Sequence, residues 1–271
     1  WIIMLRSLYS GVSGLRGFQT KLDVIGNNIA NVNTVGFKAG RVMFQDILSQ
    51  TVAGATEPEA ETGGTNPRQI GLGTTVGSID TLHTPGSPMT TNVPTDVAIN
   101  GEGFFVVTDG NQNYLTRAGN FYIDGNRNLV TSDGLSVLDN GGGAINLGGG
   151  NLEIEQVAIG SDGTITVKFD DGSTSSVGPI GLARIENPAG LDKVGNSLYV
   201  LTPNADPDGI NPVQPGTGGT GELAVGFLEM SNVDLTSEFT EMIVAQRAFQ
   251  ANSRIITTSD EVLQELVNLK R

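Results

Sequence analysis

The stretch NNIANVNTVGFKAGR, residues 27–41, places four asparagines at the end of an apolar pattern with helical spacing. Asparagine is a poor helix former, because its side-chain amide competes for nearby backbone groups. The amides therefore need partners outside their own helix, and we expect contacts between helices to supply them. Gly36 follows the β-branched Thr34 and Val35, so we expect the helix to end at this glycine, which adopts a left-handed turn at little cost.

The apolar residues before this stretch alternate steps of three and four, which predicts a helix with a coiled-coil-like seam from about Leu5 to Asn33. The same pattern recurs from Leu235 to Val267 near the other end of the chain. Asp234 or Thr236 can cap this second helix, because the side-chain oxygen of either residue accepts hydrogen bonds from free backbone N–H groups. Both terminal regions are therefore predicted to be amphipathic helices that pair with each other.

Two features favour packing among several copies of the chain over a simple helix pair within one molecule. Apolar residues such as Tyr9 and Val244 lie off the seam, so a two-helix pair leaves hydrophobic surface exposed. The amide side chains are more useful inside helix contacts than on a surface. The residues expected to pack between subunits are Leu15, Phe18, Leu22, Ile25, Asn28, Ile29, Asn31, Val32, Phe239, Met242, Gln246, Phe249, Ile256 and Leu263, with Gly36 as the helix-end turn.

The middle of the chain has a different character. Its first part is rich in glycine, proline and threonine, which predicts an extended, partly stranded connector. Short alternating runs joined by Asp-Gly and Asn-Gly turns follow, and these are typical of β-hairpins. The predicted fold class is α+β, with the paired helices as an inner layer and a central all-β domain. The predicted regions are 1–47 (helix), 48–95 (connector), 96–227 (β domain) and 228–271 (helix).

Composition excludes several functional classes. The 271-residue chain has a net charge of −14, and no basic run offsets it, so nucleic-acid binding is not expected. The chain has no cysteine, which excludes disulfides and metal–thiolate sites. No cleavable signal and no apolar stretch of membrane-spanning length is visible, so we expect no direct membrane insertion. Residues 1–50 carry +3 and residues 228–271 carry −3, so the strongly acidic part lies between them.

Catalytic and metal-binding patterns are scarce. His83 is the single histidine and no nucleophile motif lies nearby, so we expect a surface side chain rather than a catalytic base. The carboxylates available in pairs adjoin glycine or proline, where aspartate normally makes turns. These residues are Asp170, Asp171, Asp206, Asp208 and Glu102. The Asp-Gly loops lack calcium-ligand spacing and the glycine clusters lack a phosphate-binding Lys-Ser/Thr, so we expect no catalytic, cofactor or metal site.

Three motifs in this order resemble the bacterial flagellar axial proteins, the family of rod and hook subunits. They are LDVIGNNIANVNTVGFK (22–38), DVAINGEGFFVV (96–107) and the sequence from GFLEMSNVDL to the end (226–271). The resemblance implies that the terminal helices form an inner tube around an export channel, with the β domain outside. It also implies self-assembly into a helical homopolymer, contacts with other rod, junction and hook-cap proteins, and export by the flagellar type III apparatus.

Within the family, the opening MLRSLYSGVSGL favours the short hook subunit of Gram-positive bacteria, which transmits motor torque to the filament outside the cell. The alternative is a distal rod subunit of the basal body in the cell envelope, because the connector after Ile47 is as long as in that protein. A second alternative, of another class, is a ligand-binding or enzymatic β domain on a helical stalk.

Overall fold

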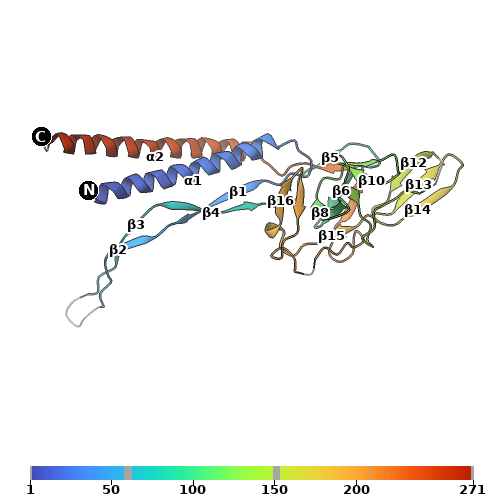
Figure 1. Cartoon of the computed structure of the whole chain (residues 1–271), viewed down its shortest axis with the longest axis horizontal. Coiled ribbons are helices and arrows are strands. Elements are labelled where there is room, and N and C mark those ends of the chain that lie inside the picture. Colours follow the sequence, from blue (N-terminus) through green and yellow to red (C-terminus); the bar gives the residue numbers. More distant parts are fainter. Residues whose placement is uncertain (1, 58–62, 149–152, 208, 270–271) are drawn as a thin grey trace. The chain divides into compact units, whose positions relative to one another are not determined.

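The computed structural model describes residues 2–57, 63–148, 153–207 and 209–269, with only the backbone at 2–5 and 266 (Figure 1). The chain forms two compact units. The helical unit contains the residues up to Ala30, Gly40–Thr81, and the residues from Asp234 onward. The β unit contains Asn31–Ala39 and Leu82–Val233. The mixed fold, with a helix near each end and a central β domain, agrees with the sequence prediction.

The helical unit is built on α1 (Ile2–Ala30) and α2 (Leu235–Leu269). The prediction that the first helix reaches Asn33 and ends at Gly36 is wrong, because α1 stops earlier and residues 31–36 fold as turns. Gly36 does adopt the left-handed conformation, with φ of 67°, but beyond the helix end. The second helix has the expected cap, since the Asp234 carboxylate accepts a hydrogen bond from the Thr236 N–H at 2.9 Å.

The two helices run side by side in opposite directions (Figure 1). They approach closely at glycines: a Cβ on Gly14 would lie 2.7 Å from Nδ2 of Asn252, and one on Gly11 would lie 3.5 Å from Cγ1 of Ile256. Lys21 and Glu241 add an ion pair at 3.1 Å. The helices therefore pack within one chain, while a regular coiled-coil geometry remains a prediction.

The face of α2 that contacts α1 overlaps the predicted seam in part. Phe239 and Phe249 are 49% and 36% exposed and Gln246 is also exposed, whereas Ala245 is fully buried. The remaining predicted α2 residues are half-buried: Met242, Ile256 and Leu263. Ile256 and Asn252 approach α1 closely because Gly11 and Gly14 have no side chains.

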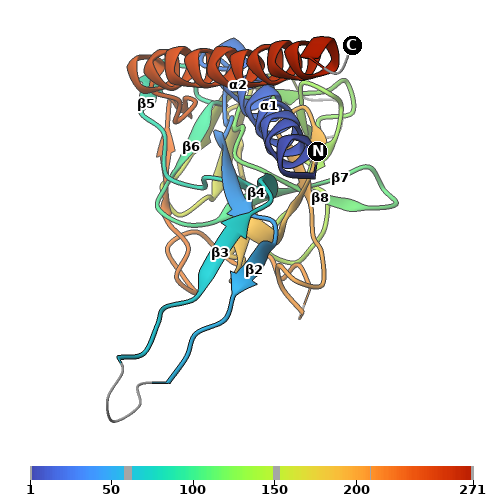
Figure 2. The ribbon, with the colours of Figure 1, turned by 90° about the vertical axis from the view of Figure 1, so that its left-hand side faces the viewer.

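A long β-ribbon completes the helical unit. Strand β1 (Gly40–Asp46) pairs with β4 (Thr74–Thr81), and β2 (Ser49–Ala53) pairs with β3 (Arg68–Gly71), all antiparallel. A hydrogen bond from Ile47 N–H to Gly73 O, at 3.0 Å, joins the two pairs into one ribbon. Helix α1 lies between α2 and this ribbon (Figures 1 and 2).

The β unit is organised around an antiparallel sheet with the order β16-β17-β8-β7-β11-β10-β9, in which β15 also pairs with β7. Its strands are β7 (Phe104–Thr108), β8 (Asn113–Thr116), β9 (Phe121–Ile123), β10 (Leu129–Thr131), β11 (Ser136–Val137), β15 (Leu182–Ala183), β16 (Asp192–Gly195) and β17 (Leu198–Val200). Strand β7 is apolar from Phe104 to Val107 because both of its faces are covered: Phe105 and Val107 enter one core cluster, and Phe104 and Val106 enter another.

Smaller sheets extend this unit. They are the three-stranded β12 (Ile154–Ile159), β13 (Ile165–Phe169) and β14 (Thr174–Val177), and the pairs β18 (Glu222–Val225) with β6 (Val97–Asn100) and β19 (Phe227–Glu229) with β5 (Pro88–Thr90). A short 3₁₀ turn, η1 (Pro188–Gly190), precedes β16. The predicted Asp-Gly hairpins are confirmed, for example at Gly110 and Gly172, which have φ of 83° and 81°.

Candidate functional site

The β unit contains a buried cluster of three charged side chains, Lys38, Arg117 and Glu229. The Glu229 carboxylate pairs with Lys38 Nζ through Oε1 and with Arg117 Nη1 through Oε2, the latter at 3.2 Å. The Lys38 and Glu229 side chains are only 1% and 4% exposed. Burial lowers the pKa of Lys38, and the hydrogen bond and charge of Glu229 oppose that shift. The carboxylate thus compensates two cations that could not be buried alone.

The cluster ties together three segments that adjoin the places where the chain passes between the two units. Lys38 Nζ donates to Thr84 O at 2.8 Å, and the Gly86 N–H donates to Glu229 Oε1 at 2.9 Å. Asn232 reinforces the same join: its Oδ1 accepts from the Ala39 N–H, and its Nδ2 donates to Leu82 O, each at 2.8 Å. The segments around residues 36–39, 82–86 and 229–232 are therefore held as one body.

His83 packs beside this cluster rather than on the surface. Its ring lies 5.7 Å from Phe104 and 5.5 Å from Tyr199. Burial, followed by the charges of Lys38, Arg117 and Lys193, lowers the pKa of His83 to about 4. The expected exposed position is wrong, because the side chain is half-buried and its Nδ1 has no hydrogen-bond partner among the described residues. Burial also raises the pKa of Tyr199 to about 12.

The asparagines of the helix end fall into different environments. Asn28 is 2% exposed, and its Nδ2 donates to Gly40 O at 2.8 Å and to Glu238 Oε1 at 3.1 Å. Its Oδ1 accepts from the Gly40 N–H at 2.9 Å. One amide therefore links α1, β1 and α2 within a single chain, where we had expected a contact between copies. Asn31 is half-buried and its Oδ1 accepts from Thr34 Oγ1 at 3.1 Å in the β unit.

The other packing residues expected around the first helix are buried or half-buried. Ile25 is 3% exposed. The Phe18 ring lies 5.5 Å from the Phe44 ring of β1. The half-buried members are Leu15, Phe18, Leu22, Ile29 and Val32, of which Val32 belongs to the β unit.

The carboxylates considered for catalysis serve turns or surface pairs. Asp171 Oδ1 accepts from the Ser173 N–H at 2.8 Å, and Glu102 pairs with Arg184 at 3.3 Å. Asp208 lies outside the described residues. No group of three or more His, Cys, Asp or Glu side chains within the described part of the chain is placed to hold a metal ion.

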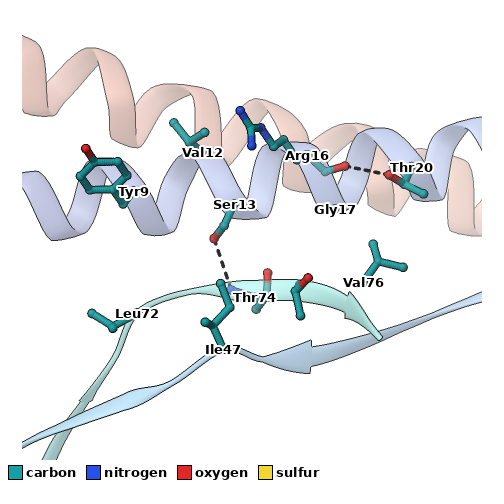
Figure 3. Close-up of a pocket in the computed structure, with 11 residues that line it drawn as sticks. Tyr9, Val12, Ser13, Arg16, Gly17, Thr20, Ile47, Leu72, Thr74 and Val76 are labelled. Carbon is teal, nitrogen blue, oxygen red and sulfur yellow. Dashed lines mark hydrogen bonds between the residues drawn. The ribbon is translucent and has the colours of Figure 1, made fainter. Parts of the chain in front are cut away.

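A groove of about 490 Å³ opens between α1 and the ribbon (Figure 3). It is lined by Tyr9, Val12, Ser13, Arg16, Gly17, Thr20, Ile47, Leu72, Thr74, Thr75 and Val76. Ser13 Oγ accepts a hydrogen bond from the Thr74 N–H at 3.3 Å, which joins the two walls. Tyr9 stands 71% exposed at one end, and Arg16 supplies the groove's cationic group (Figure 3).

Large apolar side chains are exposed along the helical unit. They are Tyr9, Val12, Met43, Phe44, Ile47, Leu48, Val52, Ile70, Ile79, Leu235, Phe239, Ile243, Val244, Phe249, Ile255, Val262, Val267 and Leu269. Large exposed apolar surface on a soluble protein marks sites of protein contact. A two-stranded ribbon is also marginally stable by itself in water. The candidate functional site of the helical unit is therefore an assembly surface.

The β unit has a cavity of about 360 Å³ between its small strand pairs, lined in part by Pro85, Ile99, Phe227 and Glu229. Both carboxylate oxygens of Glu229 are already bonded within the protein. Glu229 on the cavity wall therefore has a structural role.

Family comparisons agree with this arrangement. Residues 8–38 match the flagella basal body rod protein family, residues 98–167 match the D1 domain of the flagellar hook proteins FlgE/F/G, and residues 224–269 match the C-terminal region of the flagellar basal body rod proteins FlgEFG. The chain is 56% identical to the flagellar basal-body rod protein FlgG of Bacillus subtilis, over 99% of this chain and all of that one. It belongs to the flagellar rod and hook protein family.

Two further relatives are a rod protein and a hook protein. The flagellar basal-body rod protein FlgG of Borreliella burgdorferi is 40% identical over 99% of this chain and all of its own length. The flagellar hook protein FlgE of the same organism is 31% identical over 98% of this chain and all of its own length, in an alignment of 443 residues. As a member of this family the chain is a structural protein, not an enzyme. None of the described helices combines the length and hydrophobicity needed to cross a membrane.

Sequence reasoning missed the ion cluster and the roles of Asn232 and the helix glycines. Lys38 and Glu229 are 191 residues apart in the chain, so no local pattern connects them. One signal of a buried ion pair was present in the sequence, because Lys38 is a cation between two apolar residues, Phe37 and Ala39. The glycines at 11, 14 and 17 recur every three residues, a spacing that gathers them toward one side of a helix.

Proposed function

We propose that this protein is a distal rod subunit of the flagellar basal body, which self-assembles into a helical tube and transmits motor torque. The observation that carries the proposal is the exposed apolar surface of the helical unit, including Phe239 and Val244 on α2 and Leu48 on the ribbon. Such surface becomes buried when copies associate. A contact between two different surfaces of identical subunits generates an open helical array when it does not close into a ring.

The comparisons support a rod subunit over the hook subunit that the sequence favoured. The alignment with the Bacillus FlgG rod protein covers 268 residues, close to the 271 of this chain. The alignment with the Borreliella FlgE hook protein needs 443 residues, so that hook protein carries long additional sequence. A hook must bend as it turns, whereas a rod must stay straight, and residues 48–95 are where we place the difference.

The proposal includes the family's expected layout: terminal helices in a coiled-coil-like inner layer around a channel, and the β unit outside. It also includes export by the type III apparatus, location in the cell-envelope basal body, and end-to-end contacts with neighbouring axial proteins. The ion cluster at Lys38 and Glu229 supports torque transmission, because it holds together the segments next to three of the four places where the chain passes from one unit to the other.

Image reconstruction of tubes assembled from the purified protein tests the proposal. Straight, rigid tubes are expected for a rod subunit. Curved or supercoiled tubes would favour the hook, and a chain that remains monomeric at all concentrations and salt conditions would contradict self-assembly itself.

A further inference from the structure

The groove between α1 and the ribbon lies beyond the reach of the chain's own second helix. Gly11 and Gly14 face α2. Val12 and Arg16, which line the groove, lie about 100° or more around α1 from that contact, at 100° per residue. Since α1 lies between α2 and the ribbon, the α2 of the same chain cannot fill the groove (Figures 1 and 3).

A second apolar stripe on α2 is largely exposed, although Ile255 Cγ2 reaches the edge of α1 near Gly11. It is formed by Val244, Ile255, Val262 and Leu269, which are 58%, 43%, 46% and 82% exposed. Their steps of eleven, seven and seven residues are close to whole numbers of helical turns, so they share one face. This face lies beside the one that packs on α1 through Ala245 and Asn252.

Charge distinguishes the two surfaces. Arg16 lines the groove. Glu265 is exposed on α2 three residues after Val262, about 60° from it around the helix at 100° per residue. Neither Arg16 nor Glu265 forms an ion pair within the part of the chain that the structure describes. A cationic apolar groove and an acidic apolar helix face are complementary, and this complementarity also selects the orientation of docking.

We propose that the groove of one subunit receives the Ile255–Val262 part of this stripe from a second copy's α2, with Arg16 facing Glu265. The inference rests on the proposed function and specifies the contact that propagates the tube. This is a helix-in-groove contact between two different surfaces of the chain, the heterologous type that builds open arrays.

The dimensions agree with this occupant. From Tyr9 to Thr20, α1 lines the groove over roughly 16 Å at 1.5 Å per residue. Ile255 and Val262 are roughly 10 Å apart along α2 by the same rise, so both fit within that length. The cavity of about 490 Å³ is larger than any single side chain and requires several.

Crosslinking tests the contact directly, because the chain has no cysteine of its own. One tagged population carries Val12→Cys and a second, differently tagged population carries Val262→Cys. The two are mixed, assembled into tubes and treated with a short bismaleimide, so every product bearing both tags joins different copies. The Val12–Val262 product is expected to exceed, several-fold, the product of Val12→Cys with Ile243→Cys, a site on α2 that is 60% exposed but faces elsewhere.

Charge reversal provides the second measurement. Arg16→Glu is expected to lower the crosslinked fraction roughly two- to fivefold, because an exposed ion pair is replaced by repulsion. Combining Arg16→Glu in one population with Glu265→Lys in the other should restore it. A simple loss of folding would show no such restoration.

Each outcome is decisive. If Val12→Cys joins Ile243→Cys, or Val52→Cys of the ribbon, as readily as Val262→Cys in well-formed tubes, the assigned occupant is wrong while self-assembly stands. If the unmodified chain forms no tubes, the proposed function fails and this contact fails with it.

Discussion

The two units of the chain differ in the number of large apolar side chains that they leave exposed. The β unit buries Lys38, Arg117 and Glu229 together and covers both faces of β7, and few of its large apolar side chains are exposed. The helical unit exposes many more, among them Phe239 and Leu48 at 49% and 67%. From this difference we expect the β unit to be stable alone and the helical unit to need contacts with other copies.

The buried ion cluster gives the largest expected effect. Glu229→Gln leaves Lys38 and Arg117 buried without a countercharge, which should lower the free energy of unfolding of the β unit by about 3–5 kcal/mol. Urea unfolding monitored by circular dichroism measures this. Glu102→Gln, which breaks only the exposed pair with Arg184, is the matched control and should change little. Equal effects for both variants would show that the β unit does not depend on its buried charges.

The turn after α1 gives the next effect. Gly36 has φ of 67°, and a Cβ there would lie 2.6 Å from the backbone nitrogen of Ala118. Gly36→Ala should therefore destabilise the β unit by about 2–4 kcal/mol, through backbone strain and overpacking. Gly110→Ala is the matched control, since Gly110 also has positive φ, 83°, but nothing within 4 Å of its Cβ position. It should cost only about 1 kcal/mol. Similar melting temperatures for the two variants would rule out the close approach.

Acid should weaken the β unit through His83. The pKa of His83 is about 4 in the folded protein and 6.5 in the unfolded chain, so the unfolded chain binds the proton more readily. Stability should therefore fall as pH drops below about 6.5 and level off below about 4, by an amount on the order of 1–3 kcal/mol from this residue. Unfolding curves of the protein and of His83→Gln over this range isolate the contribution. A His83→Gln variant with the same pH dependence would contradict it.

The smallest expected effect on the monomer is on the assembly surface. Phe239→Ser should change the monomer's free energy of unfolding by no more than about 0.5 kcal/mol, because the ring is 49% exposed. The same change should raise the concentration needed for tube formation, which sedimentation measures. Tyr122→Ser, at 56% exposure on β9 of the β unit, is the control. If Phe239→Ser unfolded the monomer instead, the contrast between the units would be wrong.

The sequence indicated the helices, the hairpins and the left-handed Gly36 because each depends on neighbours a few residues away. It placed Ile256 among the packing residues, and Ile256 does lie close to Gly11 of α1. It did not indicate Asn252, because apolar periodicity does not reveal a polar side chain that packs against a glycine, here Gly14. The candidate groove could not be foreseen either, because its walls come from α1 and from a ribbon some sixty residues away, as the Ser13–Thr74 hydrogen bond shows.

The stretch NNIANVNTVGFKAGR illustrates both sources of information. Its own residues determined that a helix ends there, that a glycine turns the chain, and that its amides need partners, since these follow from local backbone sterics and side-chain chemistry. Only the tertiary structure decided the partners: Asn28 bonds Gly40 and Glu238, and Lys38 bonds Glu229. Those contacts join residues as much as 210 positions apart, and a separation of that size is closed by the fold as a whole rather than by any local pattern.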